Sequence, residues 1–241
     1  MKSKLKHVLI LGGSSDIGIE VVKYFLKNGW NVTAHYNKNS KKLKNLTNKF
    51  TSLKLVFLNF NTINNSNYKK NFLKKFNNNY DSIINLIGYI DNKNFYNTKL
   101  EDIIKSIVIN GLIPLLIIQN IIPYMIKRKF GRILNCSSIG IKYGGGNNTY
   151  NYSLSKHTSE FIPNVYRDWA KKNVYINNLR IGVTNTKIHK NILNKNIKSR
   201  IKLIPAGRMA QPYEISKLIY YLSSTENTFC TGETFNISGG E

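Results

Sequence analysis

Short apolar runs alternate along the chain with longer segments in which apolar residues recur every three or four positions. The short runs are typical of buried strands, which we expect at residues 7–11, 31–36, 53–60, 82–87, 132–136, 174–180 and 234–237. The segments with the longer period predict helices at residues 19–27, 68–76, 103–129, 152–172 and 212–223, the third of them broken or bent at its prolines. Strands that alternate with helices favour a parallel sheet with helices on both faces. We therefore expect an α/β fold, a Rossmann-type doubly wound sheet forming a single domain over residues 1–241, because no linker or repeat divides the chain.

The first predicted strand runs directly into a glycine-rich turn, residues 12–18, that opens onto the first predicted helix. A helix amino terminus carries free N–H groups and the positive end of the helix dipole, which together suit a pyrophosphate. Glycine is needed where the backbone turns sharply or where a phosphate approaches it closely. This strand–turn–helix unit predicts a dinucleotide-binding site.

A tyrosine and a lysine four residues apart, Tyr152 and Lys156, indicate a possible catalytic pair. On a helix these positions share one face, about 6 Å apart along the axis. An ammonium favours the phenolate form of a nearby tyrosine, so we expect it to lower the pKa of Tyr152 and allow proton transfer near neutral pH. The hydroxyl of Ser138 is a candidate hydrogen-bond donor to a substrate oxygen. Taken alone, the same spacing also occurs on many solvated helices.

The charge of the chain is strongly positive: 36 Lys and Arg face 12 Asp and Glu, a formal net charge of +24. The basic residues are mostly lysines spread along the chain, without a basic tail, zinc-ligand spacing or an aromatic–basic recognition motif. Biased genome composition would give the same pattern. We therefore do not expect a nucleic-acid binder, although the charge favours an anionic substrate or partner.

Membrane and metal sites are not expected. The most apolar segment, residues 107–126, is interrupted by polar residues and prolines, and the apolar run at residues 8–11 is too short for a signal peptide. Cys136 and Cys230 lack metal-ligand spacing and are expected to be buried thiols. The sequence thus predicts a cytoplasmic protein.

Taken in order, these motifs resemble the short-chain dehydrogenase/reductase (SDR) family in its single-domain form, nearly from end to end. The family's glycine-rich turn matches residues 11–18, with Asp16 where the middle glycine is usual, a departure that would cap the helix and tighten the turn. Other landmarks of the family are matched in order by Asn85 and Gly88, Asn110, Gly131-Arg132-Ile133, Ser137-Ser138, Tyr152 and Lys156, Gly182 to Thr186, Gly207-Arg208, Gln211 to Ile215 and Gly239-Gly240.

The resemblance implies that Tyr152 is the general acid in carbonyl reduction and the base in the reverse direction. It implies that Lys156 binds the nicotinamide ribose and lowers the pKa of the tyrosine, that Ser138 polarises the substrate carbonyl, and that Asn110 holds a water in the proton relay. Ser138 lies one residue further from Tyr152 than is usual, so Ser137 stays open as the alternative serine.

The cofactor implied is a nicotinamide dinucleotide, and the end of the second strand decides between NADP(H) and NAD(H). An acidic residue there would bind the ribose hydroxyls of NAD and repel a 2′-phosphate. The chain instead has Tyr36, Asn37 and Lys38, so we favour NADP(H) over the alternative that Lys38 is one more solvated lysine. The expected cofactor-binding residues are Gly12, Ser14, Ser15, Asp16, Ile17, Gly18, Tyr36, Asn37, Lys38, Asn59, Asn85, Gly88, Tyr152, Lys156, Gly182, Val183 and Thr186.

The sequence also suggests a class of substrate and a mode of assembly. Residues 187–205 form a cationic segment that suggests an anionic carbonyl or alcohol substrate, and a solvated loop is the other interpretation. The basic runs at residues 127–129 and 171–172 would suit an acidic acyl-carrier protein, as in related 3-oxoacyl reductases, or are ordinary surface. The apolar helix at residues 103–126 and the Tyr152 helix are the family's usual contact surfaces, which predicts a homotetramer or homodimer.

Three hypotheses on function follow: an NAD(P)(H)-dependent oxidoreductase, a 3-oxoacyl-(acyl-carrier-protein) reductase in particular, or a dinucleotide- or nucleic-acid-binding protein without catalysis. The presence of Asn110, Ser138, Tyr152 and Lys156 together argues against the third.

Overall fold

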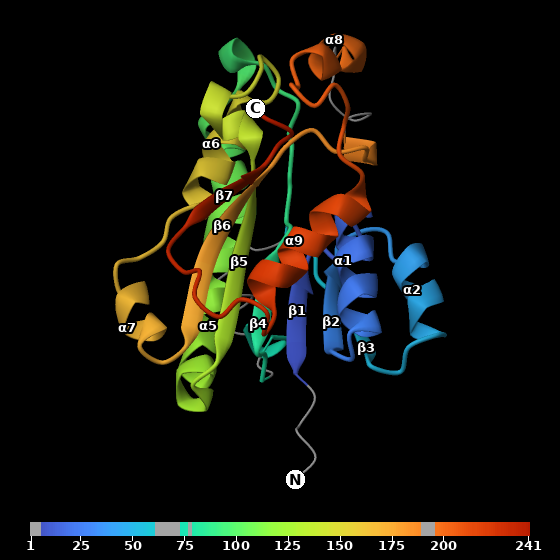
Figure 1. Cartoon of the computed structure of the whole chain (residues 1–241). Helices are drawn as coiled ribbons and strands as arrows, with labels where there is room; N and C mark the ends of the chain where they lie inside the picture. The colour runs from blue at the N-terminus through green and yellow to red at the C-terminus, as the bar shows by residue number, and fades with distance from the viewer. Residues whose placement is uncertain (1–5, 61–72, 77–78, 189–195) are drawn as a thin grey trace.

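The chain folds around one parallel β-sheet (Figure 1). The computed structural model describes residues 6–60, 73–76, 79–188 and 196–241. Within them, seven strands pair in the order β3-β2-β1-β4-β5-β6-β7, all parallel. The strands are β1 (His7–Leu11), β2 (Asn31–Tyr36), β3 (Leu53–Phe57), β4 (Ser82–Asn85), β5 (Gly131–Ser138), β6 (Val174–Ile181) and β7 (Thr234–Ile237). The predicted doubly wound Rossmann-type sheet is confirmed.

Helices cover both faces of this sheet. They are α1 (Asp16–Lys27), α2 (Lys41–Thr47), α4 (Leu100–Ile107), α5 (Ile113–Arg128), α6 (Tyr150–Ser159), α7 (Tyr166–Ala170), α8 (Ile197–Lys202) and α9 (Pro212–Ser223). Shorter turns are the 3₁₀ segments η2 (Phe95–Asn97) and η4 (Ile139–Tyr143) and the π-helical segment η3 (Val108–Leu112). In Figure 1, α1 and α9 lie side by side on the front of the sheet, and α5 lies behind it.

Alternation along the strands divides the core into two layers, because successive strand residues point to opposite faces. On β1, Val8 and Ile10 join the cluster formed with α1 and α9, whereas Leu9 and Leu11 join the cluster formed with α5. All four side chains are fully buried. This two-sided burial explains why the strands read as continuous apolar runs.

The long apolar helix is interrupted around Asn110. The sequence predicted a break at a proline, and Pro114 lies four residues further along the chain. An α-helix would use the N–H of residue 114 to bond the carbonyl of residue 110, and Pro114 has no N–H. The chain widens there into η3, in which the N–H of Ile113 bonds the carbonyl of Val108 instead. Pro123 lies inside α5 without ending it.

The single helix predicted at residues 152–172 is wrong. The structure has α6, an extended connection through Pro163, and then the short α7. A proline disfavours the helical conformation of the residue before it and lacks the N–H that a helix needs. Helix α8 was not predicted, and the helix predicted at residues 68–76 falls largely outside the described residues.

One stretch, Leu100–Arg128, is long and apolar enough by length and composition to cross a membrane. Its most apolar window is 56% buried in the fold. Residues such as Ile117, Ile121 and Met125 pack on the sheet face formed by Leu9, Ile83 and Ile133. The stretch therefore behaves as a core helix of an α/β protein.

The strand order reverses direction between β1 and β4. In such sheets the loops at the carboxyl ends of these two strands diverge to opposite faces and leave a crevice for ligands. The turn after β1 begins at Gly12, and the loop after β4 contains Gly88. This crevice is where the candidate site lies.

Candidate functional site

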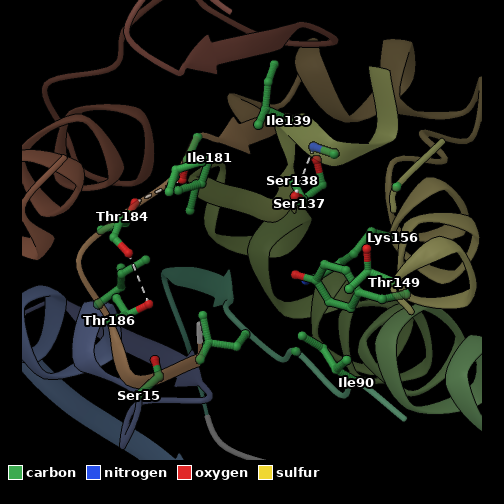
Figure 2. A pocket seen from close by; sticks show the side chains of 18 of the residues that line it. Ser15, Ile90, Ser137, Ser138, Ile139, Thr149, Lys156, Ile181, Thr184 and Thr186 are labelled. Carbon is green, nitrogen blue, oxygen red and sulfur yellow. Dashed lines mark hydrogen bonds between the residues drawn. The ribbon is translucent and has the colours of Figure 1, made fainter. Parts of the chain in front are cut away.

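A cavity of about 1450 Å³ opens at the carboxyl ends of the strands. This is larger than the roughly 300–1,000 Å³ of a typical small-molecule site, so it has room for a dinucleotide with a substrate beside it. Figure 2 shows Ser15, Thr184 and Thr186 on one side of it and Ser138, Thr149 and Lys156 on the other. The predicted site residues that line it are Ser14, Ser15, Asp16, Ile17, Gly88, Ser138, Tyr152, Lys156, Gly182, Val183 and Thr186.

The glycine-rich turn needs its glycines because of close backbone contacts. Gly12 has φ of 78°, and a Cβ there would lie 2.7 Å from the carbonyl oxygen of Leu86. A Cβ on Gly18 would lie 2.5 Å from the carbonyl oxygen of Gly12. Both distances are shorter than atoms tolerate, so a side chain at either position would push the turn apart. The two glycines therefore let the turn pack against itself and against the loop after β4, which sets the shape of the turn beside the cavity.

His35, at the end of β2, holds this turn in place. The N–H of Gly12 donates to Nδ1 of His35 (3.1 Å), and the Nε2 atom of the ring contacts the carbonyl oxygen of Leu58 (3.0 Å). Burial lowers the pKa of His35 to about 4, so the ring is neutral at physiological pH. A neutral ring with its proton on Nε2 satisfies both contacts. No periodicity or motif in the sequence indicated this role.

The amino terminus of α1 is capped by Ser15, not by Asp16 as predicted. The Ser15 hydroxyl accepts the N–H of Gly18 (3.0 Å), while other N–H groups of the first turn have no partner within the helix. Asp16 is the first helical residue and accepts hydrogen bonds from the N–H of Lys187 (2.8 Å) and from Nζ of Lys42 (3.1 Å). Burial alone would raise the pKa of Asp16, but these two donors outweigh it and keep that pKa below its usual value.

Asp16 thus brings a carboxylate to the edge of the expected phosphate site, together with a compensating lysine. The turn after β1 fits a dinucleotide phosphate through its close-approach glycines and helix N–H groups. Lys42 offsets the charge of Asp16 locally.

Lys156 and Tyr152 both face the cavity from α6, as their spacing predicted. The ammonium of Lys156 donates to the carbonyl oxygens of Ile87 (2.5 Å) and Cys136 (2.8 Å). It lies 5.9 Å from the centre of the Tyr152 ring. Burial lowers the pKa of Lys156 to about 8, although Cys136 and Glu160 act in the opposite direction. The ammonium is therefore still mostly charged at neutral pH and has one N–H beyond the two carbonyl contacts.

The pKa of Tyr152 is raised, which is opposite to the direction expected from the spacing. Burial is the main cause, and the Cys136 thiol adds to it. The Lys156 ammonium donates its hydrogen bonds to two main-chain carbonyls rather than to the phenol. A Cβ built on Gly88 would lie only 3.8 Å from the Tyr152 hydroxyl oxygen, so that hydroxyl reaches the wall formed by the loop after β4. Tyr152 is thus held as a neutral phenol with a proton to donate.

The two adjacent serines at the end of β5 differ in their contacts. The Ser137 hydroxyl donates to the carboxylate of Glu160, so its proton is not available to a substrate oxygen. The Ser138 oxygen accepts the N–H of Gly140 (3.1 Å) at the start of η4, which leaves its O–H free to donate. Ser138 is therefore the better placed of the two to bond a substrate oxygen.

Asn110 and Asn85 are buried beneath the cavity and do not line it. The Asn110 side chain bonds both main-chain groups of Tyr89 (2.8 and 3.0 Å) and the hydroxyl of Ser155 (2.7 Å). It ties η3 to the loop after β4 and to α6, so the side-chain amide is engaged within the protein. Asn85 accepts the N–H of Ile87 (3.1 Å) and shapes the same loop.

The residues expected at the adenosine end, Tyr36, Asn37, Lys38 and Asn59, are not among the described residues that line the cavity. Lys38 instead lines a smaller depression beside it, here called the lysine hollow, formed by Lys38, Asn39, Ser40, Lys41, Lys44 and Asn45. Asn39 and Lys41 line both spaces. The start of α2 therefore adds lysines, in particular Lys41 and Lys42, that the sequence did not single out.

The loop after β6 closes the cavity on the side of α1. A Cβ on Gly182 would lie 2.6 Å from the Cα atom of Ser238, so a glycine is required there. The Thr186 hydroxyl donates to the carbonyl of Thr184, whose own hydroxyl donates to the carbonyl of Gly182 (Figure 2). These bonds fold the loop back towards Asp16. Among the described residues no cluster of His, Cys, Asp and Glu could hold a metal ion.

Comparisons with known proteins agree with this geometry. The family model described as Enoyl-(Acyl carrier protein) reductase matches residues 12–241. The 3-oxoacyl-(acyl-carrier-protein) reductase FabG of Chlamydia pneumoniae is 30% identical over 243 aligned positions, which cover 98% of this chain and 96% of the relative.

Two solved structures cover 98% of this chain and 98% of their own. ElxO with NADP bound is 26% identical with a TM-score of 0.78, and 4-hydroxyisoleucine dehydrogenase complexed with NADH is 25% identical with a TM-score of 0.84. Since the family model and the relative both match nearly the whole chain, this protein belongs to the short-chain dehydrogenase/reductase family, whose members are oxidoreductases.

Proposed function

We propose that the protein is an NADP(H)-dependent oxidoreductase that interconverts a carbonyl and a hydroxyl group, with Tyr152 as general acid and base. The observation that supports it most is the convergence of Tyr152, Lys156 and Ser138 on the cavity beside the glycine-rich turn. The turn would hold the cofactor's phosphates, and Lys156 would bond its ribose with the N–H that its two carbonyl contacts leave. When bound, the cofactor supplies or accepts the hydride.

The chain's own residues account for the proton and for the geometry. Ser138 would donate its O–H to the substrate oxygen and orient the carbonyl. Tyr152, whose pKa is raised by burial, keeps its proton until negative charge develops on that oxygen, and then donates it. The Lys156 ammonium would stabilise the phenolate that remains. A neutral phenol favours the reduction direction at neutral pH.

Tyr152→Phe removes the donated proton while keeping the ring, so we expect kcat for carbonyl reduction to fall by about 10²–10⁴-fold. NADPH binding should be nearly unchanged, because the phenyl ring still fills its place. The measurement is steady-state NADPH oxidation with ethyl acetoacetate, together with NADPH binding by fluorescence. A variant that retained full turnover would remove Tyr152 from the mechanism.

The preference for NADP(H) rests on the lysine hollow. It lies at the cavity edge beyond β2, and Lys38, Lys41 and Lys44 line it. The chain has no carboxylate between Tyr36 and Lys42 that would bind the ribose hydroxyls of NAD or repel a phosphate. A 2′-phosphate would gain charge-assisted hydrogen bonds there.

Lys38→Met and Lys41→Met should each raise the KM for NADPH by roughly 10-fold, the effect of losing one hydrogen bond to a charged group. The KM for NADH should stay within about twofold, because NADH has no 2′-phosphate. Lys54→Met, on the exposed edge of β3, is the matched control and should change neither value. Equal increases in the KM values for NADPH and NADH would show that these lysines do not bind the 2′-phosphate.

A narrower candidate function is 3-oxoacyl-(acyl-carrier-protein) reduction. The likeness to the Chlamydia pneumoniae reductase over 98% of the chain favours it, as do the basic runs at residues 127–129 and 171–172, which would attract an acidic carrier. Turnover of acetoacetyl-carrier protein at a far lower KM than ethyl acetoacetate would support it. Equal KM values for the two would favour a free small substrate.

We also propose that the chain assembles as a homodimer or homotetramer through α4, α5 and α6. These helices and the adjoining segment η3 carry exposed apolar side chains, notably Leu100, Ile104, Leu112, Leu115 and Leu154. Clustered apolar exposure of this kind marks an interaction surface.

Light scattering should therefore give twice or four times the chain mass of 27.7 kDa. Ile104→Lys with Leu115→Lys should shift the mass towards the monomer, because it places two charges in the apolar contact. A wild-type protein that elutes as a monomer at micromolar concentration would contradict the proposed assembly.

We place the protein in the cytoplasm. The described residues contain two cysteines, Cys136 and Cys230, and both are free thiols. Free thiols suit a reducing compartment. The long apolar helix is accounted for by the sheet that it covers.

A further inference from the structure

A buried acidic residue, Glu160, lies directly behind the catalytic groups and is not used by the mechanism above. It caps the carboxyl end of α6, and its side chain is 8% exposed. Tyr152, Lys156 and Glu160 are spaced four residues apart, so they follow one another along one face of the helix. A carboxylate this buried requires specific partners.

Those partners come from β5 and β6. Arg180 bonds both carboxylate oxygens of Glu160, through Nε (2.9 Å) and Nη2 (2.7 Å), and the Ser137 hydroxyl donates to the same carboxylate. Ser137 and Arg180 are directly paired across the two strands. The amide of Asn178 donates to the main-chain carbonyl of Glu160 (2.8 Å), which fixes the helix end to β6 as well.

Two side chains one turn apart on α6 therefore bond two adjacent residues of β5. Lys156 holds the carbonyl of Cys136, and Glu160 holds the hydroxyl of Ser137. The next residue is Ser138, the candidate substrate-binding serine. These contacts set how far the end of β5 lies from the Tyr152 side of the helix.

We propose that Glu160, held by Arg180, is a positioning residue for the catalytic groups, which fixes the end of β5 against α6 and supplies a negative charge one turn beyond Lys156. This inference rests on the proposed function, because it assigns Tyr152, Lys156 and Ser138 to catalysis. Glu160 touches neither substrate nor cofactor and acts through Lys156 and Ser137.

The titratable and charged groups around the Lys156 ammonium determine the expected pH effects. On its own helix they are Tyr152 and Glu160, and on β5 the Cys136 thiol; the loop after β4 contributes only the carbonyl of Ile87, and Arg180 on β6 lies beyond Glu160. Glu160 raises the pKa of Lys156, and burial lowers it to about 8. Catalysis in the reduction direction needs the charged ammonium, so kcat should fall as the pH rises through this value.

Substitutions of the two partners of the ion pair should move the alkaline limb of the kcat profile, the pH range in which kcat falls, in opposite directions. Glu160→Gln removes the negative charge and should move the limb to lower pH, by about 0.5–2 units for a charge about 6 Å away. Arg180→Met leaves Glu160 uncompensated and should move the limb to higher pH. A purely structural ion pair would give both variants the same change, since both lose the same contact. Shifts of one sign, or no shift in Glu160→Gln, would overturn the proposal.

Three controls separate charge from structure. Ser137→Ala keeps both charges and should lower kcat without moving the limb. Arg180→Lys keeps the positive charge and should leave the alkaline limb of kcat at its wild-type pH. Glu101→Gln removes an exposed carboxylate on α4 and should change neither kcat nor the limb. If Arg180→Met does not fold, the comparison of Glu160→Gln with Ser137→Ala still decides the outcome.

The assay is NADPH-dependent reduction of ethyl acetoacetate across pH 6–10, with NADPH binding and thermal unfolding of each variant. Wild-type protein that binds NADPH and reduces no carbonyl compound would refute the proposed function. In that case the titration midpoint of the Lys156 side chain, followed by NMR in the same variants, still tests the inference. A midpoint unchanged in Glu160→Gln would refute it independently of turnover.

Discussion

The site depends on one buried positive charge. The Lys156 ammonium is surrounded by protein and is stabilised by two main-chain carbonyls, those of Ile87 and Cys136. An ammonium removed from water without such partners would lose its proton, because desolvation of an unpaired charge costs several kcal/mol. The two carbonyls come from the loop after β4 and from β5, so the charge also ties these two segments together at the edge of the cavity.

This arrangement follows from the parallel sheet. Parallel strands end at one edge, and the reversal of strand order between β1 and β4 opens that edge to a ligand. The glycine-rich turn, the loop carrying Gly88 and the end of β5 then meet around one space. Helix α6 lies across this edge and contributes both Tyr152 and Lys156, while Asn110 in the π-helical segment fastens α6 from behind through Ser155. The proposed catalytic groups are therefore set on regular elements of the fold, which keeps their geometry fixed.

Much of the fold could be predicted from the sequence, because apolar periodicity and short motifs depend only on residues close together in the chain. The predicted bounds of β1, β2, β7 and α9 match the structure; β1 ends just before Gly12 and α9 begins at Pro212. Tyr152, Lys156 and Ser138, which the family resemblance singled out, line one cavity. The single helix expected through Pro163 was wrong, since the apolar period outweighed the proline in that interpretation.

Other features depend on contacts between distant segments and leave no local signal. The raised pKa of Tyr152 reflects burial, which spacing alone does not report. His35 supports the glycine-rich turn only because β2 lies beside β1, and Glu160 meets Arg180 only because the end of α6 reaches β6. The lysines at the start of α2 read as ordinary solvated residues until the fold places them beside the cavity.

The most direct test of this account is the titration of Lys156 itself. NMR of ¹³C-methylated lysines, with the resonance assigned through Lys156→Arg, measures the pKa of that one ammonium. The structure predicts a value of about 8, lowered by burial. A Lys156 ammonium that titrates with the other lysines near pH ~10.4 would mean that it is solvated, and would contradict the buried charge on which the site depends.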